Sequence, residues 1–319
     1  MLKRALLLAG AGFLPQMASG SCGSAFCVIN TGAEAQSVWT EAGTRIELRY
    51  EYINQNTLRS GTHKVGPSGE PGEHDELNTH NRNWRLAIDH NFDARWGMSL
   101  VVPNVHRDHK HLYNPPEDEQ PAEPELETWR IRDLGDVQAI GRYQFLVDPL
   151  QRRAAGAQAG LKLPTGSTDE NNSEGEVAER TLQPGTGTTD LMLGAYYRGA
   201  LHATSDWFVS ALFQAPLNSH DGFRPGKLFG LNIGANVPLA GKLSAQLQGY
   251  CAVRSRDSGR EAEPEDSGGR FVYVGPGLSF ALDQHWTFYS YAQVPVYQHV
   301  NGRQLTADIG AVAGASLMF

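Results

Sequence analysis

The C-terminal segment, residues 303–319, alternates apolar and polar side chains over its whole length. Apolar residues occupy every second position from Leu305 to Phe319, and Gly, Ser, Thr and Asp fill most of the positions between them. Successive side chains of a β-strand point to opposite faces, so this segment predicts a strand with one apolar and one polar face. Such a strand is typical of outer-membrane barrels, although an edge strand of a soluble sandwich alternates in the same way.

The same alternation recurs along the chain and predicts twelve strands. In the first, Leu48, Tyr50 and Tyr52 share one face, while arginines and glutamates alternate on the other. The predicted strands are residues 44–53, 81–92, a third beginning at 96, 136–147, 154–164, 189–199, 206–217, 227–239, 242–254, 270–282, 285–298 and 303–319. The alternation alone does not separate a barrel from a sandwich.

The connections between the predicted strands separate these two folds. They alternate between tight turns and long polar loops. The turns are residues 93–94, 148–151, 200–205, 240–241 and 283–284, and the loops are 54–80, 106–132, 165–188, 218–226, 255–269 and a shorter one at 299–302. Outer-membrane barrels have short periplasmic turns and longer extracellular loops. We therefore predict an all-β fold: a transmembrane antiparallel up-and-down barrel of about twelve strands, with both termini on the periplasmic side.

The N-terminus predicts export. Lys3 and Arg4 precede a short apolar run, and small residues follow at 18–20, as in a signal peptide. The apolar run is too short for a membrane-spanning helix. We expect residues 1–20 to be a signal peptide, residues 21–42 a periplasmic N-terminal segment and residues 43–319 a barrel in the outer membrane of a Gram-negative bacterium.

The periplasmic segment contains two cysteines, Cys22 and Cys27. Because the periplasm is oxidising, we expect a local disulfide between them. A thiolate metal site is the alternative, since soft metal ions prefer sulfur ligands. We expect the segment to offer a rigid loop to the barrel mouth or to a periplasmic protein.

Several short motifs occur from Leu134 onward. They are Gly135-Asp136-Val137, residues 160–166 (GLKLPTG), Gly185-Thr186-Gly187 followed by Asp190, residues 294–297 (VPVY) and the final segment ending in Phe319. With these motifs the chain resembles the meta-pathway phenol-degradation family of outer-membrane barrels, whose members are labelled transporters. The resemblance implies an outer-membrane barrel with a transport role, and it brings no catalytic motif.

The polar faces of the predicted strands should line the barrel lumen. They are rich in charges of both signs, and neither sign dominates enough to predict selectivity for anions or for cations. The candidates are Arg45, Glu47, Arg49, Glu51, Arg85, Asp89, Arg95, Asp136, Arg142, Lys162, Asp190, Arg198, Arg254 and Asp308. Ion pairs could fill a narrow interior, or the same side chains could line a water-filled path, and twelve strands allow either.

One predicted loop contains His106, His109 and His111, followed by an acidic run between 117 and 127. Closely spaced loop histidines occur in metal-binding tracts, so a divalent cation site is one interpretation. Arg107 and Lys110 oppose a cation there, and a solvated surface loop is the alternative.

Enzymatic and nucleic-acid functions find no support in the sequence. The formal net charge of −8 disfavours nucleic acid, and no hydrolase, zinc-protease or phosphate-loop motif occurs. We predict no catalysis and no cofactor. The predicted function is a passive conduit for small organic solutes, and the alternative is a structural or docking barrel for a periplasmic redox or metal-handling protein. Expected partners are outer-membrane lipid, lipopolysaccharide and the barrel-assembly machinery, which would read Leu317 and Phe319.

Overall fold

The computed structural model describes residues 42–116, 118 and 123–319, which form thirteen strands. These are β1 (Gly43–Gly61), β2 (His63–Lys64), β3 (His74–Asn91), β4 (Trp96–Tyr113), β5 (Glu125–Leu134), β6 (Gln138–Asp148), β7 (Arg153–Lys162), β8 (Asp190–Ala200), β9 (Asp206–Pro216), β10 (Leu228–Ala240), β11 (Leu243–Arg254), β12 (Gly269–Ala281) and β13 (Trp286–Met318). The expected signal peptide, the rest of the N-terminal segment up to 41, and Cys22 and Cys27 lie outside the described residues. Within those residues, no helix has the length and hydropathy needed for a membrane crossing.

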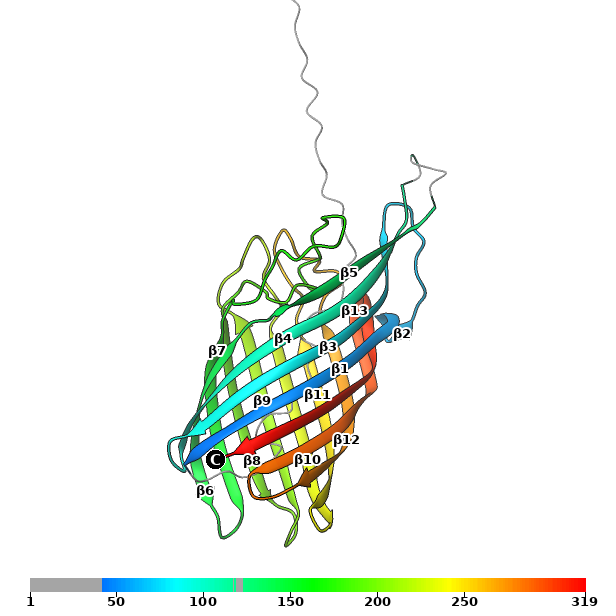
Figure 1. Ribbon diagram of the computed structural model, residues 1–319. Coiled ribbons are helices and arrows are strands. Elements are labelled where there is room, and N and C mark those ends of the chain that lie inside the picture. Colours follow the sequence, from blue (N-terminus) through cyan, green and yellow to red (C-terminus); the bar gives the residue numbers. More distant parts are fainter. Residues whose placement is uncertain (1–41, 117, 119–122) are drawn as a thin grey trace, which may run out of the picture.

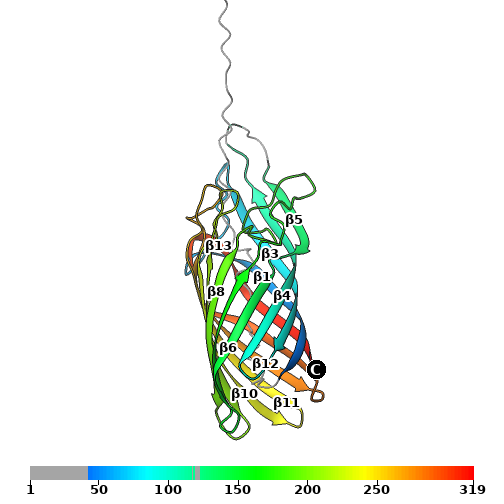
Figure 2. The same cartoon turned by 90° about the vertical axis from the view of Figure 1, so that its left-hand side faces the viewer.

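The strands close into an antiparallel barrel (Figure 1, Figure 2). In the described part of the chain, eleven elements follow one another round the ring, because β2 and β5 stand outside it and β13 pairs with both β12 and β1. A ring of antiparallel neighbours needs an even number of chain passes. The 33-residue β13 supplies two of them, since residues 287–300 run along β12 and residues 300–318 run back along β1. Gly302, with φ of +58°, lies at the reversal. The predicted barrel of twelve passes is confirmed.

The barrel is apolar outside and polar inside. On β1, Leu48 is 48% exposed on the outer face, whereas Arg49 beside it is 4% exposed on the inner face. The same sorting holds round the wall. Outward-facing apolar side chains include Leu86, Met98, Leu100, Leu161, Leu193, Phe213, Leu231, Ile233, Leu247, Leu278 and Ile309. This arrangement is that of a membrane barrel, in which lipid-facing and lumen-facing residues alternate.

Aromatic rings gather near the ends of the strands at the end of the barrel with the short turns. Trp96 contacts Tyr143 across strands with ring centroids 4.6 Å apart, and Tyr197 contacts Trp207 at 5.2 Å. Trp286 and Phe288 stack at the start of β13. Amphipathic rings favour the membrane–water interface, so these contacts mark one edge of the apolar band.

The connections sort by end as predicted. The short-turn end carries residues 92–95, 149–152, 201–205, 241–242 and 282–285, together with the C-terminus. The long-loop end carries β2 with residues 65–73, residues 114–116 and 123–124, and the connections 163–189, 217–227 and 255–268. Thr44 and Phe319 exchange two backbone hydrogen bonds of 2.7 and 2.9 Å, which join the last residue to the first strand.

Two predicted loops are shorter than expected, because β1, β3 and β4 continue beyond the apolar band. The alternation ends there, since the outward side chains of β4 become Asn104, His106, Asp108 and Lys110. Register shifts near Gln55 and Glu76 break the pattern further. The predicted loop at 106–132 is therefore mostly strand. Its second half is β5, which pairs with β4 on the long-loop side of β6 and was not predicted.

Candidate functional site

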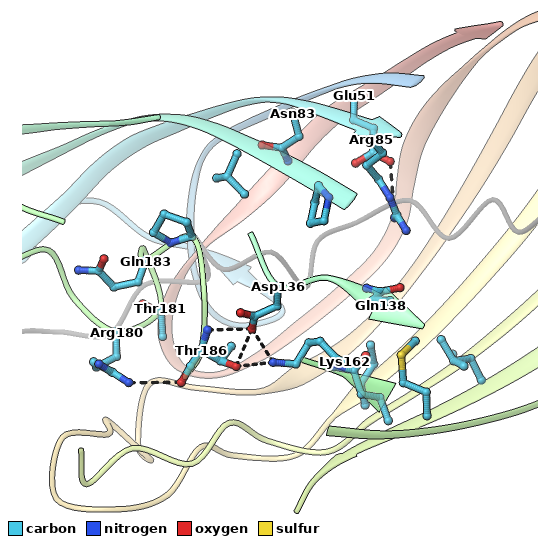
Figure 3. Close-up of a pocket in the computed structure, with 18 of the residues that line it drawn as sticks. Glu51, Asn83, Arg85, Asp136, Gln138, Lys162, Arg180, Thr181, Gln183 and Thr186 are labelled. Carbon is cyan, nitrogen blue, oxygen red and sulfur yellow. Dashed lines mark hydrogen bonds and ion pairs between the residues drawn. The ribbon is translucent and has the colours of Figure 1, made fainter. Parts of the chain in front are cut away.

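The barrel lumen contains two adjoining cavities. The first, of about 1110 Å³ including solvent-open space, lies toward the long-loop end and is bounded in part by residues 180–186 (Figure 3). The second, of about 820 Å³ on the same measure, is bounded by the first half of β1 and the last part of β3, which lie toward the short-turn end. Four side chains border both cavities: Arg85, Gln138, Met192 and Leu212. The two cavities thus follow one another along the lumen.

One wall of the cavities is charged, and its charges are paired. Because β1 and β3 each alternate with a period of two, their inner residues form a ladder on neighbouring strands. Arg45 and Asp89 face each other in register and form an ion pair of 2.7 Å. Glu51 lies 2.9 Å from Arg49 and 3.8 Å from Arg85. Buried charges need such partners, so this ladder supports the interpretation of an ion-pair network on this wall.

The part of the lumen next to the charged wall is filled by aromatic rings from β11, β12 and β13. Tyr250, Tyr273, Tyr289 and Tyr291 are each 6–8% exposed, and Tyr289 donates a hydrogen bond of 2.8 Å to Glu47. Two of these rings, those of Tyr250 and Tyr289, pack against glycines. A Cβ at Gly314 would come within 2.3 Å of the Tyr289 ring, for example. These rings narrow the lumen, and the cavities lie mainly between them and the walls formed by β1, β3, β4 and β6 to β10.

The cavity wall formed by β8 and β9 is uncharged. It presents Met192, Ser210, Ala211 and Leu212 to the space that the charged ladder borders. A molecule in the cavities would therefore meet paired charges on one side and apolar or small side chains on the other.

The loop at 163–189 folds into the lumen and is held there by a buried cation. Lys162 Nζ lies 2.6 Å from Asp136 Oδ2 and 3.1 Å from the Thr188 carbonyl, and it also donates to Thr186. Asp136 accepts from the Thr186 backbone N–H at 3.0 Å (Figure 3) and from the Gly166 N–H at 3.1 Å. The backbones of Gly166 and Gly185 touch, because a Cβ on either would lie under 3 Å from the other.

Other contacts fix the same loop. Arg107, 1% exposed, donates to the carbonyl oxygens of Thr181 and Leu182. Leu182 packs in a buried cluster with Trp129 and Ile131 of β5. The unpredicted β5 thus provides the surface against which the loop rests. The motifs at 135–137, 160–166 and 185–190 meet at this loop, so these three parts of the family resemblance belong to one structural feature.

A family model described as "Putative MetA-pathway of phenol degradation" matches residues 78–308, which is more than half of the chain. The chain belongs to this family. The match confirms the resemblance and extends it toward the N-terminus to include β3 and β4. Among curated proteins, no sequence matches this chain.

Solved structures support the same fold. The COG4313 outer membrane channel from Pseudomonas putida F1 is 11% identical, with a TM-score of 0.69, and the alignment covers 92% of this chain and 100% of that one. The transport unit of the autotransporter AIDA-I from Escherichia coli is 9% identical, with a TM-score of 0.48 over 93% and 95% of the two chains. The NanC porin is 11% identical, with a TM-score of 0.47 over 85% and 98%. At such identity the first likeness establishes the barrel fold alone.

Most of the predicted lumen residues face the interior. Those that border the two cavities are Arg45, Glu47, Arg49, Glu51, Arg85, Asp89, Asp136, Arg142 and Lys162. Arg95 does not: it is exposed in the turn between β3 and β4, where strand alternation no longer sets the direction of a side chain. That prediction is wrong.

The remaining predicted residues are elsewhere in the interior. Asp190 is buried beside Lys162, at 3.5 Å, and accepts from Gln214 at 2.7 Å. Arg198 pairs with Asp206 at the short-turn end, and Arg254 pairs with Asp257 at the long-loop end. Asp308 is half-buried at a register shift and accepts from Thr57.

The histidines of the predicted loop are on β4 instead. His109 and His111 are buried on its inner face, and His106 lies on the outer face, so the prediction of a surface loop is wrong for these residues. The structure brings His109 and His111 together with Glu76, and His111 also with His74 and Glu127. It does not bring His106 to either group. Burial lowers the pKa of His111 to about 4, and burial together with the neighbouring His111 and Arg107 lowers the pKa of His109 well below its usual value.

Several residues of the site were missed in the sequence. Glu76, Thr79 and Arg180 were not singled out, because each depends on a contact between segments far apart in the chain. Arg180 borders the first cavity and lies over the Phe223 ring at 5.4 Å. The period-two spacing of His109 and His111 was the one available signal, since it places both rings on one face of a strand.

Proposed function

We propose that this protein is a passive conduit for small organic solutes in the outer membrane of a Gram-negative bacterium. The observation that carries the proposal is the pair of adjoining cavities inside the barrel, of about 1110 and 820 Å³ including solvent-open space. Two comparisons support it. The family description refers to phenol degradation, and the solved structure with the same fold is described as an outer membrane channel.

The proposed orientation places the short-turn end and both termini in the periplasm. The long-loop end then faces the outside, in contact with lipopolysaccharide. The proposed partner for insertion is the barrel-assembly machinery, which would read Leu317 near the end of β13 and Phe319 just after it. A periplasmic protein is the proposed partner of residues 21–42. The alternative of a docking barrel rests on that segment alone.

The cavities favour a solute with an apolar body and a polar or anionic group. The apolar body would lie against Met192 and Leu212, and the polar group against the charged wall. Basic side chains outnumber acidic ones in the lining. The basic residues are Arg45, Arg49, Arg85, Arg142, Lys162 and Arg180, and the acidic ones are Glu47, Glu51, Asp89 and Asp136. We propose transport without chemical conversion, because the acids and bases of the charged wall are engaged with one another.

Proteoliposomes test the proposal. Release of benzenesulfonate, benzyltrimethylammonium and ribose would be measured for the wild type and for Met192→Trp, which adds bulk where the two cavities meet. The control is Leu193→Trp, whose side chain faces lipid and is 43% exposed. We expect the anion to leave faster than the cation, and Met192→Trp to slow release severalfold while Leu193→Trp does not. Equal release from all three proteins would contradict the proposal. So would release from wild-type vesicles that is no faster than release from protein-free vesicles.

A further inference from the structure

A cluster of imidazole and carboxylate groups lies at the long-loop end of the lumen, outside the cavities described above. His109 and His111 share the inner face of β4, and Glu76 stands directly opposite His111 on β3. The potential ligand atoms of these three buried residues all lie within 4.8 Å of one another. His111 Nε2 is 3.9 Å from Glu76 Oε1 and 3.5 Å from Glu179 Oε1.

The two imidazoles present nitrogens that the protein does not use. Among the described residues, His109 Nε2 and His111 Nε2 are buried and have no hydrogen-bond partner. The other ring nitrogen of His109 contacts Thr79 Oγ1 at 2.6 Å, which fixes the ring and leaves Nε2 as the nitrogen without a hydrogen-bond partner. A buried nitrogen without a partner costs free energy, and a metal ion would remove that cost. Metal-binding histidines are commonly oriented through their second nitrogen in this way.

The carboxylates around the cluster repel one another. Glu263, in the loop at 255–268, lies close enough to Glu179 and Glu76 for their charges to interact. The Arg107 guanidinium donates to Asn81 and to the carbonyl oxygens of Thr181 and Leu182. Lys110 points outward and is exposed. The cluster therefore places two imidazoles beside the carboxylates of Glu76 and Glu179, which are donor groups suited to a cation.

We propose that Glu76, His109 and His111 bind a divalent transition-metal ion of the zinc class, with Glu179 as the fourth ligand. Two imidazoles with carboxylates are ligands that Zn²⁺ accepts in four-coordinate sites. His74 and Glu127 lie on the far side of His111 and pair with each other at 3.2 Å, so the ion belongs with Glu76. Glu179 comes from the loop at 163–189, and the other three ligands come from the barrel wall. The ion would tie that loop to the wall above the first cavity.

Zinc titration of the purified full-length barrel tests this inference. The protein carries no histidine tag, is stripped with chelator and is titrated with Zn²⁺ against a fluorescent indicator. We expect one tight site in the wild type. His111→Ala should abolish it, and Thr79→Val, which keeps every ligand, should weaken it by about 10–100-fold. The matched control is His106→Ala, on the outer face of the same strand, which should bind as the wild type does.

One folding control accompanies the titration, and two outcomes would overturn the inference. Heat-modifiable migration in gels confirms that each variant is a folded barrel, and Glu76→Gln provides a second ligand variant if His111→Ala does not fold. Binding that survives in the ligand variants but disappears in Cys22→Ser with Cys27→Ser would place the ion at the N-terminal cysteines and overturn the inference. Equal affinity of the wild type, His111→Ala and Glu76→Gln would overturn it as well.

Discussion

At the scale of single residues, the medium that each side chain faces decides its type. Leu247 on β11 is 57% exposed to the lipid side, and its neighbour Gln248 is 7% exposed inside. The two are one peptide bond apart, yet they occupy hydrocarbon and lumen. This is why the alternation in the sequence predicted the inner and outer faces of nearly every strand.

A charge placed on each of these two neighbours tests that assignment. Leu247→Arg puts a guanidinium in the apolar band, where it should lower the free energy of unfolding by about 2–4 kcal/mol. Gln248→Arg places the same group in the polar lumen, and its effect on stability should be much smaller. Urea unfolding in phospholipid vesicles, followed by tryptophan fluorescence, measures both. Equal destabilisation at the two positions would indicate that both faces are packed in protein.

Residue direction could be predicted only where the alternation holds. Arg95 was placed in the lumen by its spacing, but it lies in a turn, where the period of two no longer applies. His109 and His111 were assigned to a loop, because the outward positions of β4 turn polar beyond the membrane and hide the strand. The pairing of Glu76 with His111 depends on a register shift that the sequence does not reveal.

At the scale of elements, the loop at 163–189 determines what the lumen can admit. The sequence predicted its position and length but not its path, because its contacts join segments far apart in the chain. Arg107 reaches Leu182, and Asp136 reaches Thr186. The motifs at 135–137, 160–166 and 185–190 were used only for the family resemblance, and the structure shows that they meet where this loop is held. The strand β5, whose inner face packs on the loop, was also missed, because the inner positions Trp129 and Ile131 are apolar but Glu127 beside them is charged.

Removing the buried cation should release the loop. Lys162→Met leaves the carboxylates of Asp136 and Asp190 buried without their cation, and breaking such a pair costs about 3–5 kcal/mol. We expect faster hydrogen exchange confined to residues 163–189, with the barrel strands still protected. The control is Arg82→Ala, because the Arg82–Asp108 pair is largely exposed and contributes about 0–1 kcal/mol. Unchanged exchange in Lys162→Met would show that other contacts hold the loop.

At the scale of the whole molecule, closure of β13 on β1 makes the protein a tube rather than a sheet. Twelve passes leave an interior between the filled core of small barrels and the open channel of large ones. Aromatic rings fill the side of β11 to β13, the loop at 163–189 fills part of the long-loop end, and the two cavities lie between them. Both interpretations of the charged residues thus apply in part: the charges are paired, and they border open space.

The most direct test of the proposed conduit is single-channel recording of the purified, folded protein in planar lipid bilayers. We predict discrete current steps and larger steps when Lys162→Met frees the inward loop. With unequal salt on the two sides, the reversal potential should shift toward the equilibrium potential of the anion. Met192→Trp should reduce the step size, and Leu193→Trp should leave it unchanged. A heat-modifiable barrel that inserts but carries no current, both as the wild type and as Lys162→Met, would contradict the account.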